Sequence, residues 1–453
     1  MRVMSIAMLA LALAGAARAE VPLAERLDAA LAPLFKTDAP GATVIVTKDG
    51  VPVFRKAYGL ADVDKGAPLQ PDMQLRLGSI TKQFTAVAIL MLVEQGKLSL
   101  KDDVTRLLPG FPAKDKGITV EHLLHHTAGI RNYTSMLSFA LIEDKDHSVQ
   151  QMIDFFKDEP LDFDPGQRWA YSNSGYFLLG AIIEQASGMR YADFIAQHIF
   201  EPLGMRDTAY EGHERSAKRR VEGYREGFFS GYKPAGKMSM TLPYAAGALV
   251  STVDDLARWD AAISAGKLLQ AESWQRAFTP CALPGGAKCA YGHGWTIGTL
   301  RGRRMAAHGG DIPGFNSQAI RLPDDKVFVA VLGNSNRNIL NTDRVAFAAA
   351  AIAVGDPFPQ PRAIPMAKLA MSAYAGTYRM AESGMRNISF DGGSLRFERK
   401  GRRPVGIRPY AVDKFFLEGS LATLDFQRGP DGAVIGFTLH GTSGDENAQR
   451  VFN

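Results

Sequence analysis

The chain has 453 residues, of which 46% are hydrophobic and 22% are charged, and this composition is typical of a soluble globular protein with two or three domains. Its formal net charge of +5 is small for this length, and the basic clusters at residues 218–220 and 301–304 are short and contain no aromatic residue, which argues against nucleic-acid binding. After the N-terminal stretch, no apolar run approaches the ~18 residues that a membrane-spanning helix needs.

Residues 1–19 are predicted to be a signal peptide. Met1-Arg2 supplies a basic start, residues 6–14 are apolar, and Ala17-Arg18-Ala19 forms a small-residue cleavage site. We therefore predict cleavage after Ala19 and a periplasmic or secreted mature chain, whose net charge falls from +5 to +3 because Arg2 and Arg18 are removed. No cysteine follows the apolar stretch, so a lipid anchor is not predicted.

The first part of the chain predicts a helix, a β-hairpin and then several helices. Residues 42–48 and 51–58 are rich in residues that favour strands, and Asp49-Gly50 between them is a strong hairpin signal. Apolar residues recur at helical spacing in the other segments, and Gly188 follows the last of them as a C-cap glycine would. The predicted helices are residues 22–36, 80–95, 119–126, 148–157 and 176–187.

The second part returns to strands after a long loop. Residues 211–240 are polar and Gly-rich and are predicted to form a surface loop that contacts substrate. Strands at both ends of the region, with helices between them, predict an antiparallel sheet to which both termini of the domain contribute, an α+β fold. The elements after the loop are a helix at 252–264, strands at 294–300, 315–322 and 326–333, and a helix at 343–354.

A proline-rich linker at residues 357–365 predicts a domain boundary. It separates a domain at residues 20–356 from residues 366–453, which show short strand patterns with turns at Asp391-Gly392-Gly393 and Pro430-Asp431-Gly432. We predict a small all-β barrel or sandwich for this C-terminal part.

Ser79 and Lys82 stand at the start of the helix predicted for residues 80–95, three residues apart and therefore on one helix face. A lysine that is removed from water can lose its proton and act as a base, which makes Ser79 a candidate nucleophile. The motif alone is weak, because Ser-x-x-Lys occurs also at residues 230–233 and 264–267. Two motifs that follow Ser79 in the chain distinguish it.

Tyr171-Ser172-Asn173 is the only Tyr-x-Asn among thirteen tyrosines, and it lies in a turn-rich segment. A phenol near an ammonium can be partly ionised and move a proton, and an amide can accept from lysine and donate to a substrate carbonyl.

The third motif, His308-Gly309-Gly310, stands between two predicted strands. Its glycines let a substrate approach the backbone at a strand edge, as half of an oxyanion hole requires.

With these three motifs in this order, the sequence resembles the serine β-lactamase and penicillin-binding-protein superfamily, and most closely its class C β-lactamase-like hydrolases and esterases. Residues 123–130 (Leu-Leu-His-His-Thr-Ala-Gly-Ile) are similar to the family's Leu-Leu-x-His-Thr-Ser-Gly stretch, and residues 246–256 to its Gly-Gly-x-x-Ser-Thr-x-x-Asp-Leu stretch. Residues 176–180 also match, and the segment that opens at 374–378 (Tyr-Ala-Gly-Thr-Tyr) is similar to the lipocalin-like domain often appended to these hydrolases.

The resemblance implies an antiparallel sheet flanked by helices, a helical subdomain and a role for each motif. Ser79 would be the acylated nucleophile, Lys82 its proton acceptor, and Tyr171 the acid and base that serves the leaving group and the deacylating water. Asn173 would bind the amide on the acyl side of the substrate. The oxyanion hole would use the N–H groups of Ser79 and Asp311, with His308, Gly309 and Gly310 beside the substrate, and no metal or cofactor would take part.

One departure from the family bears on the substrate. Penicillin-processing members usually carry Lys-Thr-Gly in the third motif, whose cation and hydroxyl hold the substrate carboxylate, and this chain contains no Lys-Thr-Gly. His308 in its place is mostly neutral at pH 7 unless it is perturbed. We therefore predict a small-molecule or peptide substrate, namely an ester, an amide, a D-amino-acid peptide or a β-lactam. The alternatives are a D,D-carboxypeptidase and a penicillin-binding sensor with little turnover.

Other chemistries have weaker support in the sequence. His122 and His126 are four residues apart on a predicted helix, but neither a zinc signature nor a third ligand accompanies them, so no metal is predicted. A Gly-x-Ser-x-Gly elbow is absent. An exported chain would allow a disulfide between Cys281 and Cys289, and the sequence leaves open whether it forms. The oligomeric state is also open.

Overall fold

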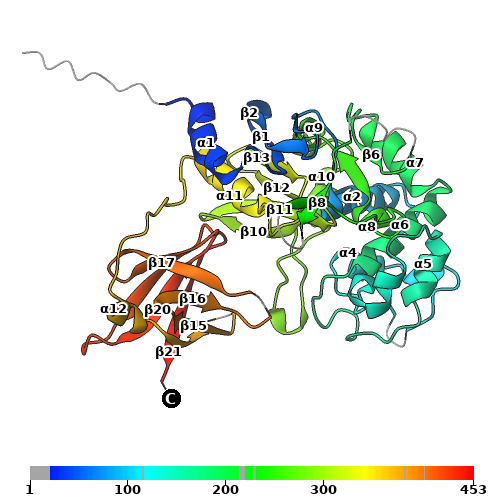
Figure 1. Cartoon of the computed structure of the whole chain (residues 1–453). Helices are drawn as coiled ribbons and strands as arrows, with labels where there is room; N and C mark the ends of the chain where they lie inside the picture. Colours follow the sequence, from blue (N-terminus) through cyan, green and yellow to red (C-terminus); the bar gives the residue numbers. More distant parts are fainter. Residues whose placement is uncertain are drawn as a thin grey trace, which may run out of the picture.

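The computed structural model describes residues 21–114, 117–213, 220–227, 231–381, 383–401 and 403–452. The predicted signal peptide and its cleavage site lie outside the described residues. Figure 1 shows a sheet covered by helices, a group of helices beside it and a separate barrel at the end of the chain. No described helix is long and apolar enough to cross a membrane.

A six-stranded antiparallel sheet forms the centre of the first domain, with the strand order β10-β11-β12-β13-β1-β2. β1 pairs with β13 along its whole length, from Ala42↔Gly333 to Lys48↔Val327, so the two ends of the domain meet in the sheet as predicted. The strands are β1 Ala42–Lys48, β2 Val51–Tyr58, β10 Thr296–Leu300, β11 Arg303–Ile312, β12 Phe315–Leu322 and β13 Val327–Gly333.

β11 was not predicted, because the sequence analysis placed His308-Gly309-Gly310 in a connection between strands. The segment contains two adjacent glycines and several arginines, and glycine is a weak strand former. In the structure, β10 and β12 both pair with this segment, and the resulting hydrogen bonds outweigh its low strand propensity. The third motif is therefore part of the central sheet.

Helices cover both faces of the sheet. α1 Leu23–Leu31 and α11 Thr342–Ala353 pack together on one face (Figure 1), where α11 is rich in buried alanines that let its backbone lie close to the strands. The other face carries α2 Thr81–Glu94 and α9 Val253–Ser264, joined by stacking of Phe84 on Trp259 with ring centroids 4.4 Å apart. This second face leads into the larger hydrophobic core.

α2 is more deeply buried than the predicted amphipathic helix. Eleven of its fourteen residues are buried, because α2 lies between the sheet and the helical group. The other predicted helices occur within a few residues of their expected limits, whereas α3, α7, α8 and α10 were not predicted. These helices are α3 Val104–Leu107, α4 Val120–Leu124, α5 Val149–Phe156, α6 Asn173–Ser187, α7 Tyr191–Ile195, α8 Tyr244–Gly247 and α10 Ala271–Ala277.

Short strands tie the helical group to the sheet. β9 pairs with both β5 and β6, and this small sheet holds the chain just before the first motif. The described parts of the predicted loop at 211–240 include the hairpin β7–β8. The short strands are β3 Leu60–Asp62, β4 Ala67–Pro68, β5 Leu75–Arg76, β6 Ala209–Tyr210, β7 Tyr224–Glu226, β8 Tyr232–Pro234 and β9 Leu249–Ser251.

The C-terminal part is a closed eight-stranded barrel, in which β14 pairs with β21. Buried aromatic side chains fill it, among them Tyr378, Phe415 and Phe437, so the barrel has a packed interior. The linker at 357–365 has no regular secondary structure, and α12 Lys368–Ser372 follows it. The strands are β14 Gly376–Met380, β15 Met385–Asp391, β16 Ser394–Glu398, β17 Val405–Ala411, β18 Lys414–Leu417, β19 Thr423–Arg428, β20 Val434–His440 and β21 Asp445–Val451.

Candidate active site

Ser79 lies in a tight 3₁₀ turn, Gly78–Ile80, that leads directly into α2. Gly78 has a φ of +54°, a conformation that favours glycine. The preceding residue, Leu77, donates its N–H to the carbonyl of Leu249 on β9 at 2.8 Å and accepts a 2.7 Å hydrogen bond from the hydroxyl of Ser317 on β12. The turn that presents Ser79 is therefore held by the small sheet on one side and the central sheet on the other.

Lys82 is fully buried, and its amine reaches three acceptors. Nζ lies 3.0 Å from Ser79 Oγ, 2.8 Å from Asn173 Oδ1 and 2.8 Å from the carbonyl oxygen of Ala246. Burial holds the pKa of Lys82 well below that of an ordinary lysine. In the neutral amine, the two N–H groups donate to Asn173 Oδ1 and to the carbonyl oxygen of Ala246, which are oxygens that can only accept, and the lone pair faces the Ser79 hydroxyl. Lys82 thus has the geometry of the base for Ser79.

Tyr171 is the third member of the cluster. Its ring lies 4.8 Å from Lys82 Nζ and packs on the ring of His126 with centroids 4.3 Å apart. Burial raises the pKa of the phenol, an effect that its hydrogen bond with Ser79 only partly opposes. The buried position of Tyr171 therefore favours the neutral phenol over the partly ionised form that a phenol near an ammonium can adopt. Tyr171 can donate a proton from the resting state.

Asn173 is the first residue of α6, and its side chain joins Lys82 to the rim of the site. Its Oδ1 accepts from Lys82, and its Nδ2 donates to the Thr134 hydroxyl at 3.2 Å. An amide nitrogen carries two protons, so one remains for a substrate carbonyl. The predicted contact of Asn173 with substrate is compatible with this arrangement and stays a prediction.

The open edge of β11 faces the Ser79 turn. β10 pairs with β11 only as far as Thr296↔Ala307, whereas β12 continues to the closing pair Ile312↔Phe315. Bonded and non-bonded pairs alternate in an antiparallel ladder, so the N–H of Asp311, next to the closing pair, points away from β12.

The Ser79 turn and β11 are in close contact at two glycines. A Cβ on Gly78 would lie 3.0 Å from the nitrogen of Asp311, and a Cβ on Gly310 would lie 1.9 Å from the carbonyl oxygen of Leu77. This approach brings the N–H groups of Ser79 and Asp311 to one region, which is the arrangement predicted for the oxyanion hole. Glycine is required at position 310 because any side chain would push the two segments apart.

His308 is directed into the protein. Its Nδ1 lies 2.6 Å from the carbonyl oxygen of Gly309, which can only accept, so Nδ1 carries the ring proton. Nε2 therefore accepts the hydrogen bond from the Tyr291 hydroxyl at 2.8 Å. Burial, with Lys82 as a second cause, lowers the pKa of His308 to about 3, so the ring is neutral at pH 7. A substrate contact of His308 stays a prediction, and both of its ring nitrogens already have partners.

Tyr291 was missed by the sequence analysis. It is buried, packs on the rings of His126 and Tyr171, and follows a hairpin that the disulfide Cys281–Cys289 closes. The sequence left open whether Cys281 and Cys289 form a disulfide, and in the structure they do. The available signal was the glycine-spaced aromatic run of residues 291–295 (Tyr-Gly-His-Gly-Trp) next to Cys289.

The histidines of the weaker zinc hypothesis have other partners. His122 Nδ1 accepts from the N–H of Thr119 in the cap of α4, and His126 Nδ1 accepts from the N–H of Ser172, each at 3.2 Å. Within the described residues, the groups of three potential ligands centre on His125 instead, and two of its neighbours there are the cysteines of the disulfide. Neither His122 nor His126 belongs to such a group.

A pocket of about 200 Å³ opens beside Ser79. Tyr133 and Phe139 form an aromatic wall that the sequence analysis did not identify, and the exposed carboxylate of Glu143 lies at the rim. The other lining residues are Gly78, Ser79, Thr134, Asn173, Met238, Pro243, Ala246, Gly247, Asp311, Ile312 and Pro313. No lysine or arginine is among these lining residues.

Comparison with known proteins places this geometry in a family context. A family profile described as Beta-lactamase matches residues 23–353. The chain is similar to Penicillin-binding protein 4* of Bacillus subtilis (strain 168), with 30% identity over 430 residues, 90% of this chain and 94% of that protein. It is similar to a D-aminopeptidase of Gluconobacter oxydans (strain 621H), with 29% identity over 367 residues, 80% and 67% of the two chains. A solved octameric penicillin-binding protein homologue from Pyrococcus abyssi has a TM-score of 0.67 at 25% identity, covering 93% of this chain and 99% of that chain.

The contact between Gly310 and Leu77 predicts a strong effect of Gly310→Ala. The new Cβ would lie 1.9 Å from a backbone oxygen, so we expect a loss of about 1–3 kcal/mol in the free energy of unfolding and slower acylation of Ser79. Denaturant titration and the rate of labelling by a fluorophosphonate measure the two effects. Gly309→Ala is the control, because its nearest neighbour is the end of the Gln318 side chain at 2.7 Å, which can rotate. Equal effects of both variants would contradict this account.

The buried amine of Lys82 predicts opposite effects on activity and stability. Lys82→Met replaces the amine by an unbranched apolar side chain one atom shorter, and we expect acylation of Ser79 to fall by about 10²–10⁴-fold. In the wild type, unfolding lets Lys82 bind a proton that the folded state lacks, so stability rises with pH by about 1.4 kcal/mol per unit between the folded pKa and ~10.4. The variant lacks this slope and should be the more stable protein at low pH, because it does not bury an amine. Its advantage in the free energy of unfolding should therefore become smaller as pH rises.

Denaturant titrations of both proteins at several pH values between 6 and 9 measure this difference. A difference that is independent of pH throughout the range would mean that Lys82 is protonated in the folded state.

Proposed function

This chain belongs to the beta-lactamase family and is a serine hydrolase, and on that premise we propose that it is exported and cleaves an ester or amide through an acyl-enzyme on Ser79. The observation that carries the proposal is the fully buried amine of Lys82, 3.0 Å from the Ser79 hydroxyl oxygen and below its ordinary pKa.

In the proposed reaction, Lys82 takes the proton of Ser79 while Oγ attacks the substrate carbonyl. The N–H groups of Ser79 and Asp311 stabilise the negative charge that develops on the carbonyl oxygen. Tyr171 then donates its phenol proton to the leaving oxygen or nitrogen, and the protonated Lys82 returns a proton to Tyr171. Water attacks the acyl-enzyme by the reverse proton route and releases the acid.

The charges around Ser79 favour a substrate that carries an amine near the scissile bond. The pocket lining contains two carboxylates, those of Glu143 and Asp311, and no lysine or arginine, while Lys82 is buried behind it and His308 is neutral. A carboxylate next to the scissile bond would lack a cationic partner, whereas an ammonium group would find Glu143. The similarity to a D-aminopeptidase supports the same choice. We therefore propose amides and peptides of D-amino acids, and small esters, over β-lactams.

A D,D-carboxypeptidase is the second candidate, and a penicillin-binding sensor with little turnover is the third. The D,D-carboxypeptidase is favoured by the 30% identity of this chain to a penicillin-binding protein, over 94% of the length of that protein. Both candidates share the acylation of Ser79 with the main proposal and differ from it in the substrate or in the rate of deacylation. The buried Lys82 and Tyr171 argue against a protein that binds its ligand without acylation, because such a protein needs neither proton carrier.

Export is proposed from residues 1–19 alone, which have the basic start, apolar run and small-residue cleavage site of a signal peptide. A periplasmic or secreted location is compatible with the Cys281–Cys289 disulfide, since oxidising compartments preserve such bonds.

Labelling of Ser79 tests the mechanism. We expect a fluorophosphonate to add one adduct to residues 20–453, and peptide mass spectrometry to locate it on Ser79 and to find none in Ser79→Ala. Chromogenic esters then separate turnover from trapping: steady release of product supports the enzyme, and one equivalent followed by a stop supports the sensor. A label that persists in Ser79→Ala would overturn the assignment of the nucleophile.

Glu143 tests the substrate class. Glu143→Gln keeps the size of the side chain and removes its charge, so we expect KM for D-alanine p-nitroanilide to rise about 3–10-fold, as for one ion pair at a partly exposed site. The kcat for this substrate and the hydrolysis of p-nitrophenyl acetate, which has no amine, should stay unchanged. Asp144→Asn is the matched control, because Asp144 is also exposed and does not line the pocket. A similar change for both substrates would contradict recognition of the amine.

A further inference from the structure

A second pocket lies next to the Ser79 pocket and has a different charge. Its volume is about 330 Å³. We call it the Arg76 groove, and its lining residues are Gln74, Arg76, Glu211, Arg220, Val221, Glu222, Gly223, Ala235, Gly236, Lys237, Val250, Pro313 and Phe315. Three of these are cationic and two are carboxylates, so the lining carries one net positive charge.

Two arginines share a single carboxylate in this groove. Arg76 donates to both oxygens of Glu211 at 2.7 and 2.8 Å, and Arg220 makes a 2.7 Å ion pair with the same carboxylate. One guanidinium is enough to neutralise Glu211, so the positive charge of the second is not balanced by it. Arg220 is 46% exposed and can therefore also meet a ligand.

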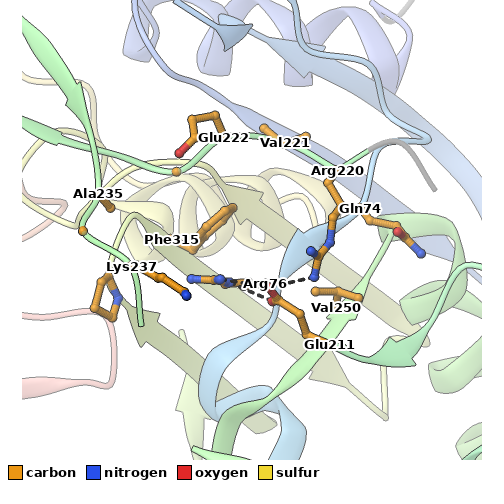
Figure 2. A pocket seen from close by; sticks show the side chains of 13 residues that line it. Gln74, Arg76, Glu211, Arg220, Val221, Glu222, Ala235, Lys237, Val250 and Phe315 are labelled. Atoms are coloured by element: carbon orange, nitrogen blue, oxygen red, sulfur yellow. Dashed lines mark hydrogen bonds and ion pairs between the residues drawn. The ribbon is translucent and has the colours of Figure 1, made fainter. Parts of the chain in front are cut away.

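Lys237 and Phe315 complete a site for an anion. Figure 2 shows the Lys237 side chain extending toward Arg76, with Phe315 beside them. The guanidinium of Arg76 lies over the Phe315 ring, 5.4 Å from its centroid. Lys237 is exposed, and no acceptor for its amine is described among the residues that the structure covers.

Three chain segments run from the Ser79 pocket into this groove. Arg76 stands three positions before Ser79 in the chain, so their Cα atoms are at most about 11 Å apart. Lys237 precedes Met238, which lines the Ser79 pocket, and Pro313 lines both spaces. A substrate bound at Ser79 that extends past Pro313 therefore enters the groove.

We propose that the Arg76 groove binds a carboxylate carried by the substrate at a distance from the scissile bond, with Arg220 and Lys237 as its cationic partners. The inference rests on the proposed hydrolase function and names a further feature of its substrate. Planar guanidinium groups match a carboxylate with paired hydrogen bonds, and the ammonium of Lys237 adds a point charge. Together with Glu143 near Ser79, the groove favours a substrate with an amine close to the reacting carbonyl and a carboxylate farther away, as in a peptide.

The experiment compares p-nitrophenyl monoesters of dicarboxylic acids with the same esters capped by a methyl group. Adipate is the shortest acid used, because shorter esters are attacked by their own carboxylate, and the series continues to sebacate. A second pair, the acetate esters of 4-hydroxy-3-nitrobenzoic acid and of its methyl ester, carries the carboxylate on the leaving group. We expect kcat/KM for the free acid to exceed that for the capped ester by about fivefold or more in one of the series, as for one to two ion pairs.

The variants Arg220→Gln and Lys237→Gln should remove this preference through KM, with kcat and the capped esters unchanged. Lys233→Gln is the matched control, because Lys233 is an exposed cation on the same loop and does not line the groove. The preference should also shrink as salt is added. Equal rates for acids and capped esters in the wild type, or a preference that survives both variants, would overturn the proposal.

Calorimetric titration of Ser79→Ala with monomethyl suberate and with dimethyl suberate keeps the two proposals separate. Binding of the monoacid alone, lost in Lys237→Gln, supports the groove even if no ester is hydrolysed, and in that case the proposed hydrolase function fails by itself. The groove proposal fails, and the hydrolase function stands, if capped esters are hydrolysed as fast as the free acids and the monoacid does not bind more tightly than the diester.

Discussion

The burial of one amine determines how the rest of the site is built. Lys82 is completely removed from solvent, and burial of a charged ammonium is unfavourable enough to lower its pKa. The amine nevertheless has partners from three elements: Ser79 before α2, Asn173 on α6 and Ala246 on α8. Three segments that are distant in the sequence must therefore meet at one nitrogen, which is why α2 lies in the middle of the molecule and is buried on nearly all sides.

The second constraint is the close contact between the Ser79 turn and β11. At Gly310 the two backbones are so close that a single methyl group would collide with the carbonyl of Leu77. This contact joins the helical group to the central sheet, and it brings together two N–H groups from opposite parts of the chain. The termination of pairing between β10 and β11 at Ala307 keeps the edge of β11 open to a substrate. A rigid sheet thus positions one of the two N–H groups of the proposed oxyanion hole, and a turn positions the other.

The polar groups behind the site are neutral, and the charged groups lie beside it. His308 and Tyr291 bond to each other in the interior, where they support the wall of the site and bring no charge to it. The charges that a substrate can meet are instead on its two sides, with Glu143 near Ser79 and the cations of the Arg76 groove beyond Pro313. Most of these residues are on loops, whereas Ser79, Lys82 and Tyr171 lie in α2 or directly before α2 and α6. Substrate preference can therefore differ among proteins with this fold while the catalytic cluster stays unchanged.

The amino-acid sequence by itself determined the features that depend on neighbours in the chain. The hairpin at 42–58 followed from Asp49-Gly50, and the end of α6 from Gly188, because turn and cap conformations are local. The motifs around Ser79, Tyr171 and His308 predicted a catalytic cluster from residue types alone, and the structure brings their side chains together.

Only the tertiary structure decided the directions in which the pKa values of Lys82 and Tyr171 shift, the strand that contains His308, and the place of Tyr291. The physical reason is that a pKa depends on burial and on groups from other segments, and that a glycine-rich strand forms only when neighbouring strands pair with it. Neither condition is present in the local sequence.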